Sequence, residues 1–218
     1  MAISLKNALP ILLAVAIIMT GCKRSPVTAS HDPDPAAYLD KPIVVGHGIG
    51  DLEVQNTTLS QATARLGTKF KRAESEGSFG SKCVDGVCDN NFQKFTDIRL
   101  DYSDYGIMLG FRAIEGDSTP ESELKIRFIY ITCVPKANGC AFTGSADGGI
   151  HLGSTRKEVI SSMGPSDTWT GRQGIICKKS GVNIRFKGEY LRIGDDDTVE
   201  SFEIFSPANF NEFEHRSV

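Results

Sequence analysis

The clearest helical pattern of apolar and polar residues lies between residues 149 and 165. Thr155 and Glu158 are spaced as a capping box, in which each side chain satisfies a free backbone N–H group of the other residue. Gly164 and the proline after it end the pattern, because glycine adopts left-handed conformations and proline cannot continue a helix. The pattern therefore predicts a helix over residues 156–163. Because such a helix rises only about 12 Å and is unstable alone, we expect it to lie on a sheet.

An earlier segment has the same pattern. Thr58 and Gln61 are spaced as a second capping box, and Gly67 closes a second short run of helical apolar positions. Thr58 precedes Thr155 by 97 residues, and Gly67 precedes Gly164 by the same number. The sequence therefore predicts a second short helix of the same type.

Extended segments downstream of the two predicted helices also correspond. They match at an offset of 75 residues, 106–111 with 181–186 and 124–130 with 199–205. The difference between the two offsets leaves 22 extra residues between helix and sheet in the first copy. We therefore predict an α+β fold in which two tandem helix-plus-antiparallel-strand units form a joined sheet. The alternative is that two unrelated small domains with capped helices align this well by chance.

Alternation along the last strand of each unit predicts which side chains face outward. Side chains two apart share a face, which groups Lys125 and Arg127 with Ile129. Because burying an unpaired charge costs several kcal/mol, this face cannot lie against a helix. We therefore predict that Lys125 and Arg127 face outward and bind a protein partner. In the second unit the same face would carry Val199, Ser201 and Glu203.

The N-terminal pattern is that of a targeting segment. Lys6 precedes an apolar run of 12 residues, which is too short to span a bilayer as a helix. The run leads into Met19-Thr-Gly-Cys22, which resembles the bacterial lipobox, so we predict a lipoprotein signal peptide over residues 1–21 and lipidation at Cys22. By resemblance to lipoprotein sorting, Lys23 indicates the outer membrane, with the folded part facing the periplasm. The alternative is ordinary secretion with Cys22 left as a spare thiol.

The composition beyond the lipobox predicts the remaining boundaries. Residues 22–40 carry three prolines among small and polar residues and read as a lipidated N-terminus and flexible tether. We expect a first α+β unit with a disulfide-loop insertion over 41–140 and a second unit over 141–208. Residues 209–218 then form a C-terminal tail.

Five cysteines remain after Cys22, and the periplasm is oxidising. Cys83 and Cys88 flank an Asp-Gly turn, as in a small hairpin closed by a disulfide. Cys133 and Cys140 flank a second short loop, so we predict a disulfide in each. Cys177 then remains a buried thiol. The competing interpretation pairs Cys177 with Cys133 or Cys140.

The net charge and the candidate reactive residues argue against nucleic-acid binding and against catalysis. A net charge of −3 argues against a nucleic-acid partner, which needs clustered Lys and Arg. Ser154 and Lys157 match an S-x-x-K signature, but the spacing to the other motifs of penicillin-binding enzymes is far too short. The three aspartates 195–197 are more typical of a solvated turn than of a calcium site. We therefore expect no catalytic residues, no metal and no cofactor.

Trp169, the only tryptophan of the chain, follows the second predicted helix. It is either an exposed anchor for a protein partner or a side chain that packs over the end of its own helix. The insertion between Lys71 and Phe95 is the other candidate for binding.

The segment Ile150-x-Leu-Gly-x-Thr-x-x-x-Val-x-x-x-Met-Gly-x-Ser166 resembles a known repeat. It is similar to the repeat of the SmpA/OmlA lipoproteins, the BamE-type component of outer-membrane protein assembly, and to that of the tandem-repeat β-lactamase inhibitory proteins. The first family implies one such unit behind a lipobox. The second implies two units with small disulfide loops and a concave sheet that grips an enzyme. The match is looser in the first unit, where Ala62 stands at the position of the valine.

These observations together favour a non-enzymatic outer-membrane lipoprotein with a periplasmic protein-binding module of the envelope-assembly or scaffold type. Its partners would be a protein in the periplasm or outer membrane and, through the lipid anchor, the membrane itself. The alternative is a periplasmic inhibitor or immunity protein against a hydrolase. A third class, a hydrolase, is weakened by the lack of a catalytic constellation.

Overall fold

The computed structural model describes residues 32–79, 83–84, 87–88, 93–137, 139–164, 168–171, 174–177, 180–187 and 194–209. From Asp32 onward the chain forms one compact unit. The predicted signal peptide and Cys22 lie outside the described residues, as does nearly all of the predicted C-terminal tail. Lipidation of Cys22 therefore stays a prediction.

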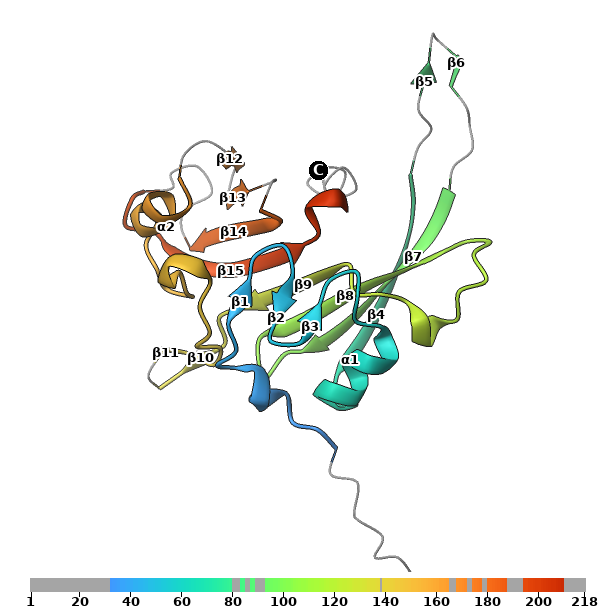
Figure 1. Cartoon of the computed structure of the whole chain (residues 1–218), viewed down its shortest axis with the longest axis horizontal. Helices are drawn as coiled ribbons and strands as arrows, with labels where there is room; N and C mark the ends of the chain where they lie inside the picture. Colours follow the sequence, from blue (N-terminus) through green and yellow to red (C-terminus); the bar gives the residue numbers. More distant parts are fainter. Residues whose placement is uncertain are drawn as a thin grey trace, which may run out of the picture. The chain divides into compact units, whose positions relative to one another are not determined.

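The centre of the fold is one antiparallel sheet, seen edge to edge in Figure 1. Its eight described strands run in the order β12-β13-β14-β15-β9-β8-β7-β4. Each half of the sheet is a meander, and the two meanders join where β15 pairs with β9. The strands are β4 (Lys71–Phe79), β7 (Gln93–Tyr102), β8 (Ile107–Ile114), β9 (Phe128–Thr132), β12 (Thr168–Gly171), β13 (Gly174–Cys177), β14 (Val182–Lys187) and β15 (Thr198–Phe205).

Smaller strands surround this sheet. A three-stranded antiparallel sheet lies before the first helix, and two short hairpins lie at the tip of the β4–β7 ribbon and after β9 (Figure 1). The three strands of the small sheet are β1 (Ile43–Val44), β2 (Gly48–Ile49) and β3 (Leu52–Glu53). The hairpins are β5 (Cys83–Val84) with β6 (Val87–Cys88), and β10 (Pro135–Lys136) with β11 (Gly139–Cys140).

The described part contains two α-helices, α1 (Leu59–Leu66) and α2 (Arg156–Met163), each of eight residues. Both begin with the predicted capping box. The hydroxyl of Thr58 or Thr155 accepts a hydrogen bond from the backbone N–H of the residue three positions later, and the side chain of that residue accepts one from the backbone N–H of the threonine. Both end at the predicted glycine, at φ 79° in Gly67 and 76° in Gly164. The predicted helix limits are confirmed. Short 3-10 helices are η1 (Pro35–Tyr38), η2 (Glu121–Glu123), η3 (Asp147–Gly149) and η4 (Pro207–Asn209).

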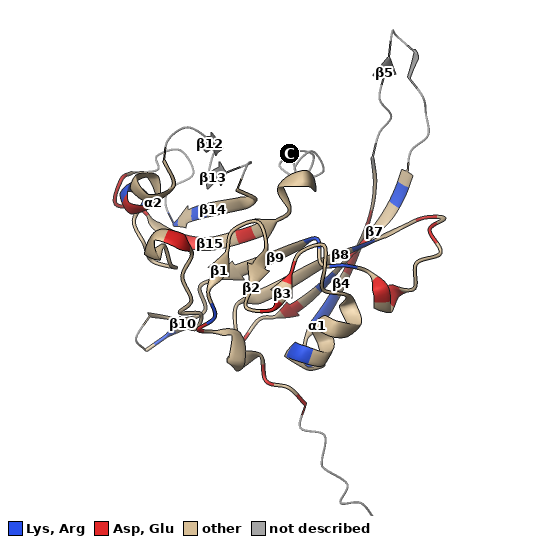
Figure 2. Cartoon of the chain, viewed as in Figure 1, with Lys and Arg blue, Asp and Glu red and all other residues tan. Residues whose placement is uncertain are grey.

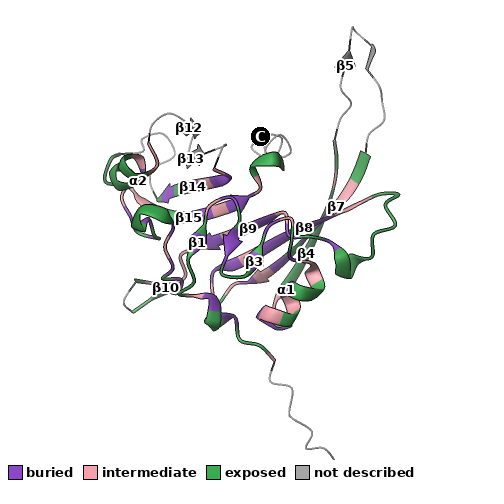
Figure 3. Ribbon diagram, viewed as in Figure 1, coloured by how far each residue is buried: buried purple, intermediate pink, exposed green. Residues whose placement is uncertain are grey.

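Among the described elements, β1–β3, α1 and α2 lie on one face of the sheet, and we call the opposite face the uncovered face, although Phe128, Ser201 and Phe205 on it are at most 5% exposed. The covered face carries a single apolar core that runs through both halves, and β1–β3, α1 and α2 pack on it (Figures 1 and 3). Alternate residues of each central strand enter this core, and all of them are at most 4% exposed. They are Ile98 and Leu100 on β7, Ile107, Leu109 and Phe111 on β8, Ile129 and Ile131 on β9, Phe202 and Ile204 on β15, and Val182, Ile184 and Phe186 on β14.

The predicted fold class is wrong. The protein is mostly β rather than an α+β protein built of two helix-plus-strand units. Its helices have only two turns each, while strands before α1 and a long β4–β7 ribbon add extended structure that the helix pattern did not predict. The ladder between β9 and β15 joins both halves in one sheet, and the two halves share one core.

The predicted tether is shorter than expected at its C-terminal end. Pro35 and Tyr38 are buried, and Tyr38 donates a hydrogen bond of 2.5 Å to Asp51. Burial, and then this bond, raise the pKa of Tyr38 above its ordinary value. Asp32 accepts hydrogen bonds from the backbone N–H and hydroxyl of Thr68, at the end of α1. Residues from Asp32 onward therefore belong to the folded unit, because local polar contacts and an apolar ring hold them on it.

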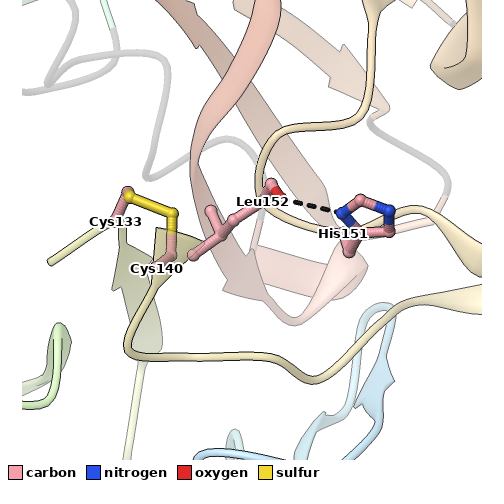
Figure 4. The surroundings of a disulfide bond; sticks show 4 residues. All are labelled: Cys133, Cys140, His151 and Leu152. Carbon is pink, nitrogen blue, oxygen red and sulfur yellow. Dashed lines mark hydrogen bonds between the residues drawn. A yellow bond between two sulfur atoms is a disulfide. The ribbon is translucent and has the colours of Figure 1, made fainter. Parts of the chain in front are cut away.

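The Cys133–Cys140 disulfide is confirmed and closes the β10–β11 hairpin, with a Cα–Cα distance of 4.9 Å. Figure 4 shows Leu152 lying against this disulfide while its carbonyl contacts the His151 ring, 2.8 Å away. At the other predicted loop, Cys83 lies directly opposite Cys88 in an antiparallel hairpin. The side chains of Cys83, Cys88 and Cys177 lie outside the described part, so their pairing stays a prediction.

Candidate functional site

The structure separates the residues that alternation placed on one outward face. Lys125 is exposed, whereas Ile129 is fully buried in the core. The backbone N–H of Arg127 donates to Gly110, which the register also pairs with Phe128, so two residues stand opposite one, as in a β-bulge. A bulge shifts the alternation by one residue, which is why the predicted shared face is wrong.

Lys125 also lies apart from the uncovered sheet face. Its segment leaves the sheet and pairs with the loop that leads into α1, where Ile126 donates to Thr57 and Lys125 bridges Thr58. Lys125 is thus exposed beside a helix N-terminus. Arg127 is half-buried and has an interaction of its own. Protein binding by Lys125 and Arg127 stays a prediction, but the shared outward face from which it was inferred does not exist.

The corresponding group in the second half is also divided. Val199 is 2% exposed and lies in the core, and Ser201 is 1% exposed on the other face. The register of β14 against β15 shifts between Arg185 and Phe186, which leaves Glu200 of β15 without an opposite residue on β14. Glu203 is half-exposed, as predicted. A second irregularity in the ladder therefore caused the second error.

The uncovered face carries a continuous row of cross-strand neighbours, which we call the central row. In an antiparallel sheet, directly opposite residues point to the same side, so the register alone assigns them to one face. The row crosses the whole sheet, about 34 Å at roughly 4.8 Å per strand. From edge to edge it consists of Trp169, Ile176, Asn183, Glu203, Tyr130, Met108, Asp101 and Lys71.

Every described side chain of the central row is accessible. Lys71 is exposed, and Asp101, Met108, Tyr130 and Glu203 are half-buried, like Asn183. The middle of the row is therefore formed by an aromatic ring and a thioether, and its sides by charged and amide groups. Aromatic residues, Met and Arg are enriched at the centres of protein interfaces. The row has the composition of a protein-binding surface.

Trp169 belongs to this row by its backbone register, opposite Ile176 on β13. Its side chain lies outside the described part, so neither reading of it is decided. Its strand, β12, lies four strands from β9, the strand that follows Lys125, which is roughly 19 Å at about 4.8 Å per strand. The sequence had no signal for Tyr130 and Met108, which only the strand order brings together.

A buried ion pair lies on the same face, toward the β4–β7 ribbon. Arg112 donates to both carboxylate oxygens of Asp97, at 2.7 and 3.1 Å, and the two side chains are 3% and 10% exposed. The Phe95 ring lies over the guanidinium at 3.5 Å. It also covers Gly77, where an added Cβ would meet the ring at 2.4 Å. The two charges compensate each other, and both charged side chains are almost inaccessible to a partner.

A cleft of about 800 Å³ lies on the covered side, between the β1–β2 turn, η3 and the end of α2. Its rim includes His47, Asp147 and Gln55, which has a left-handed φ of 66°. Its floor is made of Val182 and Phe202, which are fully buried. Because a ligand could touch only the rim without opening the core, the cleft is a weaker candidate than the central row.

Acidic residues also lie elsewhere, on β4 and on the loop between β8 and β9 (Figure 2). There Arg72 pairs with Glu74 and, through two hydrogen bonds, with Glu121, which lowers the pKa of Glu121. Among the described residues, no group of three His, Cys, Asp or Glu could hold a metal ion. Asp195 accepts from Arg156, and the Asp197 carboxylate accepts from the backbone of Gly194.

The S-x-x-K serine has a structural role. Ser154 is 4% exposed, and its hydroxyl accepts a hydrogen bond from the backbone N–H of His151.

None of the helices in the described ranges is long and apolar enough to cross a membrane. No family model matches the chain, and no curated protein or solved structure is significantly similar to it.

Proposed function

We propose that the protein is a non-enzymatic lipoprotein of the bacterial outer membrane, anchored through Cys22, that binds a periplasmic protein with the uncovered face of its sheet. The observation that carries the binding role is the central row. It places the half-buried Tyr130 and Met108 in the middle of a face about 34 Å wide, which suits a protein partner better than a small ligand.

The anchoring part of the proposal is supported by the sequence alone. An apolar run of 12 residues ends at the lipobox cysteine, and several acyl chains on one residue give stable anchoring. If Asp32 is the first residue fixed to the folded unit, the nine residues between it and Cys22 let the chain reach at most about 35 Å. The folded unit would then remain close to the membrane surface.

An assembly or scaffold role and a role as inhibitor or immunity protein would use the same face. The resemblance of residues 150–166 to both families supports each role equally. We favour the assembly or scaffold role, because the predicted lipobox is shared with the BamE-type proteins. Location of the gene beside a toxin or hydrolase gene would favour the immunity role.

Lipidation is tested by metabolic labelling with palmitate. The wild-type protein should be labelled and the Cys22→Ser variant should not. Equal labelling of both proteins would reject the anchor.

Binding is tested by photo-crosslinking in cells that express the full-length chain. Benzoylphenylalanine at position 108 should give an adduct with a second protein, and the same probe at exposed Lys157 on the covered side should not. Tyr130→Ala should reduce the adduct formed from position 108. Absence of an adduct at 108, or equal adducts from both positions, would reject the binding face.

A further inference from the structure

Two arginines on the uncovered face differ from the other arginines of the described chain. Four form ion pairs with Asp or Glu, and Arg127 has an interaction of its own. Arg99 and Arg185 are exposed, and within the described ranges neither side chain has a hydrogen bond or an ion pair. The four paired arginines are Arg65, Arg72, Arg112 and Arg156.

Both arginines border the central row, from opposite sides. Arg99 lies opposite Gly110, in line with Phe128, and Arg185 lies opposite Ser201, in line with Thr132. Three strands lie between β7 and β14, so the two strands are four steps, or roughly 19 Å, apart at about 4.8 Å per step. The two guanidinium groups therefore flank the row diagonally, with Tyr130 between them.

The acidic residues of the row are already engaged. Asp101 accepts a hydrogen bond of 2.8 Å from Ser103 and lies opposite Lys71. Glu203 accepts from the Asn183 amide at 3.3 Å. Among the described residues, the groups on this face that still lack a partner are therefore mainly cationic, although the chain as a whole carries a net charge of −3.

We propose that Arg99 and Arg185 each receive a carboxylate from an acidic partner protein that lies across the central row. This inference rests on the proposed binding role of that face. A guanidinium binds a carboxylate through two parallel hydrogen bonds, which fixes direction as well as charge. Two such contacts this far apart exceed the span of a small ligand, so the partner is a folded surface with acidic groups on both sides of an apolar patch.

The groups between the arginines favour a protein over an anionic membrane. Arg, Tyr and Met together are typical of the centre of a protein interface. Binding to anionic lipid needs only clustered Lys and Arg, and the two arginines here are spread over five strands.

The test begins with the photo-crosslinker at position 108 of the full-length chain, followed by identification of the partner and of the crosslinked peptide. We expect an acidic peptide. Arg99→Glu combined with Arg185→Glu should reduce the adduct at least tenfold. The matched reversal of Lys41 and Lys157, two exposed cations outside the row, should leave it unchanged. Reversing two acidic residues of the partner peptide to Lys should restore binding to the doubly reversed chain.

The purified proteins give the second readout. The dissociation constant should rise with sodium chloride in the wild type. The Arg99→Lys and Arg185→Lys variants keep the charge but lose the two parallel hydrogen bonds, so they should bind more weakly with the same salt dependence. In the doubly reversed variant the dissociation constant should no longer rise with salt. Vesicles of phosphatidylglycerol serve as the membrane probe, and wild-type protein should not bind them through these arginines.

Different outcomes reject different claims. An undiminished adduct in the doubly reversed chain, or an equal loss in the Lys41 and Lys157 control, overturns the acidic partner and leaves the binding face intact. If the wild type binds vesicles and the double reversal abolishes this binding, the acidic protein partner is replaced by lipid. If the adduct joins two copies of the chain, the acidic partner is replaced by self-association. If position 108 gives no adduct at all, the proposed function itself fails.

Discussion

The two halves of the sheet begin with equivalent helices but are covered differently. Helix α1 fully buries Ala62 and Leu66, and β1–β3 cover the same half. Helix α2 fully buries only Val159, while Ile160 and Met163 lie partly exposed at the edge of the core. The same capping box and the same length thus give helices that contribute unequally to the core, because burial depends on segments outside the helix.

The halves also differ on the uncovered face. Arg112 of β8 forms the buried pair with Asp97, whereas the residue 75 positions later, Lys187 of β14, is exposed. The local chain fixes where a charge stands in a strand, but the neighbouring strand decides whether that charge is paired and buried. We therefore expect the first half to be more sensitive to mutation than the second.

The largest expected effect is at the buried ion pair. Asp97→Ala leaves Arg112 buried without its carboxylate and should lower the free energy of unfolding by about 3–5 kcal/mol. Urea denaturation measures the change. Lys187→Ala, the exposed counterpart, should stay within about 0.5 kcal/mol of the wild type. Similar losses in both variants would remove this difference between the halves.

The second effect compares the two helices directly. Leu66→Ala should cost about 2–5 kcal/mol, because Leu66 is fully buried and its removal leaves a cavity. Val159→Ala removes fewer carbon atoms, from a helix that buries fewer side chains, and should cost roughly half as much. The same denaturation assay checks both. A larger loss from Val159→Ala would show that α2, rather than α1, secures the core.

The third effect separates the two capping boxes by pH. Thr58→Ala and Thr155→Ala should each cost about 1 kcal/mol at neutral pH. The backbone N–H of Thr155 lowers the pKa of Glu158 below its ordinary 4.5, so the stabilisation by this carboxylate is present above that value and is lost as the pH falls through the lowered pKa. Gln61 occupies the same position in α1 and does not titrate.

Amide hydrogen exchange measures this pH effect in each helix. Protection at Val159 and Ile160, corrected for the intrinsic exchange rate, should fall between pH 7 and 3 more than protection at Ala62 and Thr63. The Glu158→Gln variant should lose the extra pH dependence. An equal fall in both helices would place the acid sensitivity elsewhere in the fold.

The smallest effect is at Gln55, in the cover of the first half. Gln55 has a φ of 66°, whereas every other position in the described chain with a left-handed φ is glycine. Gln55→Gly relieves this strain at some cost in chain entropy and should raise the free energy of unfolding by about 0.5–1 kcal/mol. Gln55→Val should lower it. If neither variant differs from the wild type by thermal melting, the loop does not hold this conformation in solution.

The sequence determined the local elements of this protein. The limits of α1 and α2 followed from two capping boxes and two glycines, because these interactions join residues only three or four positions apart. The Cys133–Cys140 disulfide and the β5–β6 hairpin followed from loops of similarly short range. Such features form wherever the chain can satisfy its own backbone, so the sequence alone is sufficient to predict them.

Only the tertiary structure decided the fold class and the candidate site. The pairing of β9 with β15 joins segments about 70 residues apart, and the central row exists only because eight strands align in one register. Because of the extra residue opposite Gly110, Ile129 points into the core and does not share a face with Lys125. Alternation predicts a face only while the ladder is regular, and whether a ladder stays regular depends on packing between strands that the local sequence does not contain.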